Sequence, residues 1–376
     1  MTIVRVGRNR YAAPVSSWRK PAWSNRAKNR AVIVASQAAL KVVSRLSERT
    51  MRLAAGGRSL TVEGNTLDPM LQLLRIGQRT MGLQGLVDGD VDQARTYVRS
   101  TARVMAGADI GVEVENLTIP GPAGPIPARH YRPADSEGAP LLVYIHGGGF
   151  VIADLDVYDG VCRLIARDAG VHVLSVDYRL APEHTAPAAL DDSYAAYRWA
   201  VVHAADLGAD PNRVAVGGDS AGGNLAAGVC LRARDDNALA PFLQLLIYPM
   251  VDATGSTRSE KLFGSGFFLT ERDITWFVDN YLGGSGLEPT DPRVSPRFAE
   301  DLSGLPLALV VTAGFDPLRD QGDDYAKALR DAGVPVDHRS FGSMTHMFVN
   351  YALLGGGCAR AMAEVNSALR AHLVHG

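Results

Sequence analysis

The sequence predicts an α/β fold in which helices cover both faces of an eight-stranded, mostly parallel sheet. From about Gly111 onward, short apolar runs alternate regularly with helix-like stretches, which is the order of elements that builds such a sheet. Most of these runs are separated by the long crossover connections that parallel neighbours need. No apolar run approaches the ~18 residues of a membrane-spanning helix.

The first two predicted strands form an antiparallel hairpin. Val112–Ile119 and Ile126–Arg132 flank Gly121–Pro125, whose glycines and prolines are typical of a tight turn. The other six strands are short apolar runs of the kind that a sheet buries on both faces. They are Leu141–Ile145, Val171–Val176, Arg213–Val216, Phe242–Tyr248, Leu307–Thr312 and Val336–Phe341. Helices are predicted at about Tyr158–Arg167, Pro187–His203, Ala221–Arg234, Asp320–Ala332 and Ala359–Leu373.

Two segments lie outside this alternation. The interval from Met250 to about Pro306 is too long for a simple crossover, and it is rich in aromatic residues. Together with the N-terminal part of the chain, we expect it to form a lid over one end of the sheet. The predicted division is a basic extension at 1–60, a first lid segment at 61–110, an α/β domain at 111–250 and 307–376, and a second lid segment at 251–306.

The net charge of −2 hides a basic N-terminus. Residues 1–60 contain 13 Lys and Arg and one acid, Glu48, whereas the remainder contains 25 basic and 39 acidic residues. A cleaved signal peptide is disfavoured, because the basic stretch is too long and Ala31–Val43 is interrupted by polar residues. The arm either packs on the acidic body or makes a weak contact with a membrane surface. We expect no nucleic-acid partner and a cytoplasmic protein, with peripheral membrane contact as the alternative.

The three cysteines, Cys162, Cys230 and Cys358, are widely spaced and odd in number. This pattern excludes a disulfide scaffold and a cysteine zinc site, and it indicates a reducing compartment. Each cysteine is expected to be a small buried apolar residue.

Gly218–Gly222 has the sequence G-D-S-A-G and predicts a nucleophile at Ser220. It follows the apolar run Val214–Val216 and precedes a helix-forming stretch, which is the strand–turn–helix setting of a nucleophile elbow. Small residues surround the serine, as so tight a turn requires. The helix that follows also directs its N-terminal dipole toward developing negative charge.

The run His146–Phe150, H-G-G-G-F, predicts the oxyanion hole. Its three glycines let backbone N–H groups turn inward without obstruction by a Cβ atom. We assign the N–H groups of Gly148, Gly149 and Ala221 as the donors. A phosphate-binding loop is disfavoured, since no G-K-[ST] follows and the G-x-G-x-x-G spacing is absent. His146 is expected to anchor the loop by hydrogen bonding.

A serine nucleophile needs a base and an acid that orients the base, and in this fold the three occur in the chain order Ser, Asp, His. Asp316 follows the predicted strand Leu307–Thr312, and His346 follows Val336–Phe341. Each therefore lies just past a strand end, where it can face Ser220. The nearby acids Asp320 and Asp323 are expected to be first-turn helix residues, and the other C-terminal histidines (His338, His372 and His375) bystanders.

Taken together, these motifs resemble the bacterial hormone-sensitive-lipase family of α/β-hydrolases, in the branch with G-D-S-A-G. The matching pieces are HGGGF at 146–150, DYRLAPEH at 177–184, GGDSAGGNLA at 217–226, DPRVSP at 291–296 and DPLRDQG at 316–322. The resemblance covers about residues 65–376. From the residues alone, DYRLAPEH at 177–184 is expected to be a buried structural ion network.

The resemblance implies an α/β-hydrolase fold with a two-part helical cap, a carboxylesterase activity, no metal and no cofactor. It places the family's triad on Ser220, Asp316 and His346 and its oxyanion donors on Gly148, Gly149 and Ala221. It also implies a homodimer. The chain departs from the family at residues 1–60, which precede the usual start, and at Met347, where the family commonly has glycine after the catalytic histidine.

The predicted reaction is hydrolysis of short- to medium-chain carboxylic esters, with a small-molecule ester as substrate. Amide or peptide hydrolysis would use the same machinery, and a non-catalytic receptor on a hydrolase fold is a third reading. The substrate-binding candidates are Phe150, Asp219, Phe263, Phe267, Phe268 and Met347. The aromatic residues of 263–281 belong either to the lid core or to the wall of an acyl pocket.

Overall fold

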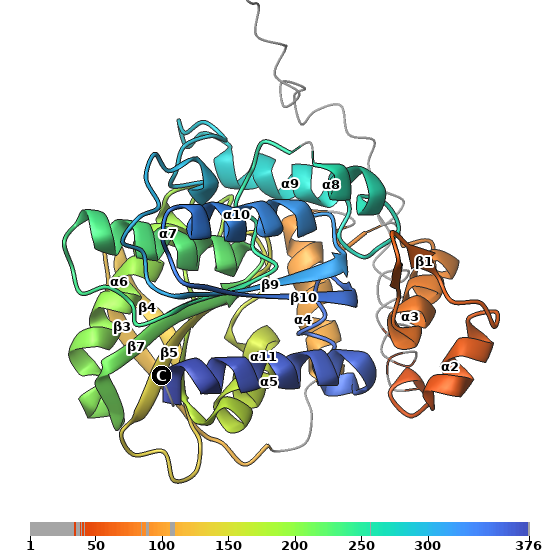
Figure 1. Cartoon of the computed structure of the whole chain (residues 1–376), viewed down its shortest axis with the longest axis horizontal. Helices are drawn as coiled ribbons and strands as arrows, with labels where there is room; N and C mark the ends of the chain where they lie inside the picture. Colours follow the sequence, from red (N-terminus) through yellow and green to blue (C-terminus); the bar gives the residue numbers. More distant parts are fainter. Residues whose placement is uncertain are drawn as a thin grey trace, which may run out of the picture.

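The computed structural model describes residues 34, 38, 40, 42–83, 85–87, 90–105, 110–255 and 257–374. Its centre is an eight-stranded sheet with the strand order β10-β9-β8-β7-β5-β6-β4-β3 (Figure 1). The strands are β3 Glu113–Gly121, β4 Gly124–Arg132, β5 Ala139–Ile145, β6 His172–Val176, β7 Ala209–Asp219, β8 Gln244–Ile247, β9 Ala308–Phe315 and β10 Val336–Thr345. In this sheet, β3–β4 and β4–β6 are antiparallel and the other pairs are parallel. The predicted eight-stranded, mostly parallel sheet is therefore confirmed.

Helices cover both faces of this sheet, as predicted. On one face lie α6 Ala188–His203, α7 Ala221–Asp235 and α10 Arg319–Asp331, and on the other lie α5 Leu155–Ile165 and α11 Gly356–Val374 (Figure 1). Because successive side chains of a strand point to opposite faces, β5 contributes to two cores. Leu141, Val143 and Ile145 join the core under α6 and α7, whereas Leu142 and Tyr144 join the core under α5 and α11.

Several element boundaries differ from the sequence prediction. The helix predicted from Tyr158 begins at Leu155, because the Asp154 carboxylate accepts a hydrogen bond from the Val157 N–H, and it continues as a π-helix over Ala166–Gly170. β10 extends to Thr345, past a register irregularity after Phe341. The short sheet of β1 Thr61–Val62 and β2 Asn65–Thr66 was not predicted, since two-residue strands carry no detectable alternation. Short 3₁₀ helices occur at Ala205–Leu207, Pro296–Phe298 and Ala352–Leu354.

Both segments outside the alternation contain helices joined by turns and irregular structure. The first contains α3 Pro69–Thr80 and α4 Val91–Met105, and the second contains α8 Arg258–Phe263 and α9 Glu271–Leu282. A helix from the predicted basic extension, α2 Glu48–Ala54, packs against α3. Most of residues 1–41 lies outside the described residues, so the expectation about the basic arm falls there.

Asp273 joins the two segments. Its carboxylate, which is 1% exposed, accepts hydrogen bonds from the backbone N–H groups of Leu86 (3.0 Å) and Val87 (3.1 Å) in the first segment. It also accepts from the Thr270 N–H and hydroxyl, which closes a capping box at the start of α9. One buried carboxylate therefore satisfies donors from parts of the chain that are far apart in sequence.

Replacing Asp273 by alanine is expected to lower the free energy of unfolding by about 3 kcal/mol, because buried N–H groups lose their acceptor. The measurement is chemical denaturation of native and variant proteins. Glu271→Ala is the matched control, since Glu271 is an exposed acid in the first turn of the same helix. Equal stability of the two variants would contradict the role of Asp273 as the link.

In the described part of the chain, no helix is long and apolar enough to cross a membrane. Cys162, Cys230 and Cys358 are all buried thiols, as expected. Burial raises the pKa of Cys162 to about 12.

Candidate active site

Ser220 lies at a sharp turn between β7 and α7. Its backbone has φ 56° and ψ −119°, a conformation that L-residues rarely adopt. The turn fits only because its neighbours are small: a Cβ atom on Gly222 would lie 1.9 Å from the carbonyl oxygen of Ile145. The turn raises Ser220 above the carboxyl end of the sheet, in the strained setting typical of a functional residue.

His346 and Asp316 complete a hydrogen-bonded chain with this serine. His346 Nε2 lies 3.0 Å from Ser220 Oγ, and His346 Nδ1 lies 2.8 Å from Asp316 Oδ2. Asp316 follows β9 directly and His346 follows β10, so neighbouring strand ends bring them together. Both side chains are almost fully buried. The structure thus brings together the three residues that the sequence predicted.

The carboxylate of Asp316 sets the tautomer of His346. An ionised carboxylate only accepts hydrogen bonds, so Nδ1 carries the proton and Nε2 presents its lone pair to the Ser220 hydroxyl. The other carboxylate oxygen of Asp316 accepts from the Leu318 N–H at 2.8 Å, which fixes the carboxylate. The Tyr248 ring packs against His346, with ring centroids 4.5 Å apart. In this arrangement His346 is ready to take the serine proton.

The neighbouring acids and histidines lie apart from this chain. Asp320 accepts a hydrogen bond from the Ser259 N–H, and Asp323 lies 3.2 Å from His338. His372 pairs with Asp337 at the sheet edge. The last of the predicted bystanders, His375, lies outside the described residues.

The glycine loop after β5 borders the serine. Gly148 and Gly149 have φ of 114° and 59°, so this path needs glycine. A Cβ atom on Gly149 would lie 2.2 Å from the Phe277 ring, which means that α9 presses directly on the loop. Ala221 is buried at the first position of α7, immediately after Ser220.

His146 anchors this loop from behind. The ring is fully buried, stacks on Tyr178 and has Nδ1 2.7 Å from the Gly147 carbonyl oxygen. The Tyr178 hydroxyl donates to the carbonyl oxygen of His146 at 2.9 Å. Burial lowers the pKa of His146 to about 4, so the ring is neutral at pH 7. These contacts fit the anchoring role that we expected.

Asp219, one residue before the nucleophile, accepts hydrogen bonds from donors on strand β5, helix α5 and the glycine loop. Its carboxylate accepts from the hydroxyls of Tyr144 and Tyr158, each at 2.8 Å, and from the Gly147 N–H at 3.1 Å. Burial raises the pKa of Asp219, and the hydrogen bonds from the two tyrosines oppose that shift. Asp219 therefore ties the serine turn to the glycine loop, although the sequence grouped it with substrate contacts.

The DYRLAPEH stretch forms ion pairs, as expected, but these are not a buried network, because the Glu183 side chain is 53% exposed. Arg179 makes two hydrogen bonds of 2.8 Å to the buried Asp192. Glu183 pairs with Arg95 of α4, and this arginine lowers the pKa of Glu183 to about 2. Arg95 also donates to the Val151 carbonyl oxygen, so the pair links the first lid segment to the glycine loop.

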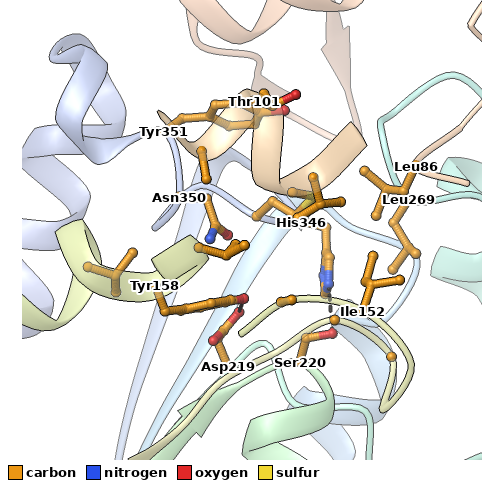
Figure 2. Close-up of a pocket in the computed structure, with 18 of the residues that line it drawn as sticks. Leu86, Thr101, Ile152, Tyr158, Asp219, Ser220, Leu269, His346, Asn350 and Tyr351 are labelled. Carbon is orange, nitrogen blue, oxygen red and sulfur yellow. Dashed lines mark hydrogen bonds between the residues drawn. The ribbon is translucent and has the colours of Figure 1, made fainter. Parts of the chain in front are cut away.

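A cavity opens above Ser220 and His346 (Figure 2). Its volume of about 110 Å³ is room for several water molecules. Both lid segments contribute to its wall, with Leu86, Tyr97 and Thr101 from the first and Leu269, Ile274 and Phe277 from the second. Asp219 and Met347 also line it. Met347 has φ 67°, which is unusual for a residue with a side chain.

Four of the predicted substrate contacts do not line this cavity. Phe150 is fully buried and stacks on Tyr281, with ring centroids 3.8 Å apart. Phe263 and Phe267 pack against Phe315, and Phe268 packs against Tyr351, all within the core. The expectation is corrected for these four, because their rings fill space between the lid and the sheet.

Several residues that line the cavity were not among those predicted from the sequence. Tyr97 and Thr101 come from α4, Tyr158 from α5, and Asn350 and Tyr351 from the turn after His346. The available signal was proximity in sequence: Asn350 and Tyr351 follow the predicted base by four and five residues.

Comparison with known proteins agrees with this geometry. The family described as alpha/beta hydrolase fold matches residues 142–350, a range that includes Ser220, Asp316 and His346. The chain is 54% identical to the carboxylic ester hydrolase LipN of Mycobacterium tuberculosis, over 93% of this chain and 94% of that protein. It is 36% identical to ethyl acetate hydrolase of Pseudomonas putida, over 81% and 97%. The solved structure of a hyperthermophilic esterase from Pyrobaculum calidifontis has a TM-score of 0.72 and 39% identity, with 80% of this chain and 97% of that chain covered.

Proposed function

Because this chain belongs to the bacterial hormone-sensitive-lipase family of α/β-hydrolases and is a carboxylic ester hydrolase, we propose that it cleaves short- to medium-chain esters through an acyl-enzyme on Ser220. The hydrogen-bonded chain Ser220–His346–Asp316 carries the proposal, since it lies at the base of a cavity large enough for a small ester.

In the first half-reaction, Ser220 Oγ attacks the ester carbonyl carbon while His346 Nε2 takes the hydroxyl proton. Asp316 holds the imidazole in the required tautomer and stabilises the imidazolium. His346 then gives the proton to the leaving alkoxide oxygen, and the C–O bond breaks to leave an acyl ester on Ser220. Water repeats the sequence, with His346 as its base, and releases the carboxylic acid.

The backbone N–H groups of Gly148, Gly149 and Ala221 stabilise the negative oxygen of both tetrahedral intermediates. The positive φ of the two glycines and the position of Ala221 at the start of α7 support this role. Removing one such donor typically raises the barrier by about 3–4 kcal/mol. Asp219 supports the same hole indirectly, because it holds the Gly147 N–H and the serine turn together.

The acyl group enters a cavity that is closed by a two-part cap, made from residues 61–110 and 251–306. The apolar side chains of Leu86, Leu269 and Phe277 in its wall support an apolar acyl chain of limited length. Each added methylene contributes about 0.8 kcal/mol only while it finds apolar surface to bury. An acyl chain that is longer than the cavity buries no more apolar surface, so its additional methylenes contribute no further binding free energy.

We therefore expect kcat/KM to rise from acetyl esters, to reach a maximum at about four to eight acyl carbons and then to fall. The measurement is kcat/KM for chromogenic esters with two to sixteen acyl carbons, beside an amide of the best acyl group. A steady rise to the longest chain, or activation on emulsified triglyceride, would contradict the proposed size limit.

A further inference from the structure

The two sides of the cavity differ in their chemistry. Figure 2 shows Leu86, Ile152 and Leu269 on one side of the Ser220–His346 pair, and Tyr158, Asn350 and Tyr351 on the other. The first group offers only hydrocarbon surface. The second group includes the Tyr351 hydroxyl and the Asn350 amide, so the two sides suit different halves of an ester.

The polar side borders the leaving alcohol. His346 Nε2 must protonate the alcohol oxygen, so the turn that follows His346 lies next to that half of the substrate. Hydrogen bonds from the Asn350 N–H to the Met347 carbonyl oxygen (3.0 Å) and from the Tyr351 N–H to the Phe348 carbonyl oxygen (3.2 Å) shape this turn. It brings Met347, Asn350 and Tyr351 into the cavity wall.

Asn350 has unused hydrogen-bonding capacity. The Tyr158 hydroxyl, which lies beside Asn350 in the cavity wall, donates to Asp219 at 2.8 Å and so is already engaged. Oδ1 of Asn350 is buried with no hydrogen-bond partner among the described residues. The side chain is 8% exposed, and an unpaired amide oxygen at such a site is unfavourable. A small rotation about the soft terminal torsion presents it to a ligand.

Tyr351 and Thr101 add to this capacity. Within the described residues, the structure gives no hydrogen bond for the Tyr351 hydroxyl, whose ring is held by Phe268. The Thr101 hydroxyl donates to the Tyr97 carbonyl oxygen, which leaves its own oxygen free to accept. A ligand with several hydroxyl groups matches these three side chains, because a hydroxyl both donates and accepts.

We propose that the natural substrate is an ester of a polyhydroxy alcohol with an apolar acyl group, and that Asn350 and Tyr351 bind the free hydroxyls of its alcohol half. This inference rests on the proposed esterase function. It assigns the apolar side to the acyl chain and the polar side to the alcohol.

The test compares glyceryl 1-monohexanoate with 2-methylbutyl hexanoate, whose alcohol has the same heavy-atom skeleton without hydroxyls. Asn350→Leu is expected to lower the ratio of the two kcat/KM values about tenfold, and Tyr351→Phe several-fold, since each removes one hydrogen-bonding group. The ratio of the two kcat/KM values is the readout, because any effect of a variant on the triad or on the acyl half is common to both esters. Asn212→Leu is the matched control, because Asn212 is exposed and far from the cavity wall.

Two comparisons with the native protein keep the test independent of variant folding. The 2,3-dimethoxypropyl ester, which cannot donate, should be cleaved about tenfold less efficiently than the glyceryl ester. Moving the hydroxyl to the acyl half, in ethyl 6-hydroxyhexanoate, should lower kcat/KM relative to ethyl hexanoate. An unchanged glyceryl preference in both variants, or a gain from the acyl hydroxyl, would overturn the inference while the esterase function stands. Failure of the native protein to cleave any of these esters would overturn both.

Discussion

Replacement of Ser220 by alanine is expected to lower kcat for ester hydrolysis by about 10⁴-fold or more while leaving the fold intact. Ser220 Oγ is 3.0 Å from the base that activates it, and in the described part of the chain no other nucleophile lies within the same hydrogen-bonded chain. The oxyanion donors and the cavity remain in the variant, so weak residual catalysis is the most that they can supply. Hydrolysis of a chromogenic hexanoate ester provides the measurement.

Ser340→Ala is the matched control for this experiment, because Ser340 is an exposed serine on the edge strand β10. It should keep native kcat and native stability. An active Ser220→Ala protein, free of native enzyme, would exclude the acyl-enzyme mechanism.

The second large effect is expected for Asp316→Asn, which should lower kcat roughly 10⁴-fold. An asparagine keeps the shape of the site. However, it can direct its amide nitrogen toward His346 Nδ1, which favours the tautomer with the proton on Nε2. That tautomer cannot accept the serine proton. The 2.8 Å contact and the full burial of Asp316 leave no room for water to substitute.

Asp320→Asn provides the comparison, since Asp320 lies four residues away and bonds Ser259 and Arg319 instead of the histidine. It should reduce stability modestly and leave kcat near the native value. Equal losses of kcat in the two variants would show that Asp316 has no special role in orienting the base.

The catalytic residues could be predicted because each has a local signal. Ser220, Asp316 and His346 each follow a strand of the sheet directly, and the carboxyl ends of parallel strands meet at one edge of a sheet. Gly218 and Gly222, which lie two residues before and after Ser220, predict the tight turn. For these residues, knowledge of the chain order and of the strand ends was sufficient.

The cavity wall could not be predicted in the same way. In the second lid segment, aromatic content indicated apolar contacts but not their partners. Phe277 faces the cavity, whereas Phe263 and Phe267 pack on Phe315. In α4, residues 97, 98, 101 and 102 line the cavity with helical spacing. Such spacing marks a buried face, and only the neighbouring elements decide whether that face meets a core or a ligand.

The residues of the triad are far apart along the chain, so the recovery of activity during refolding reports the formation of long-range contacts. Ser220 and His346 are 126 residues apart, so their contact closes a long loop and has a high entropic cost until the strands between them are paired. Local contacts, such as those within the β3–β4 hairpin, form without that cost. During refolding, helical signal should therefore return before hydrolysis. Hydrolysis can return only after β9 and β10 have docked beside β8, because Asp316 and His346 follow these two strands.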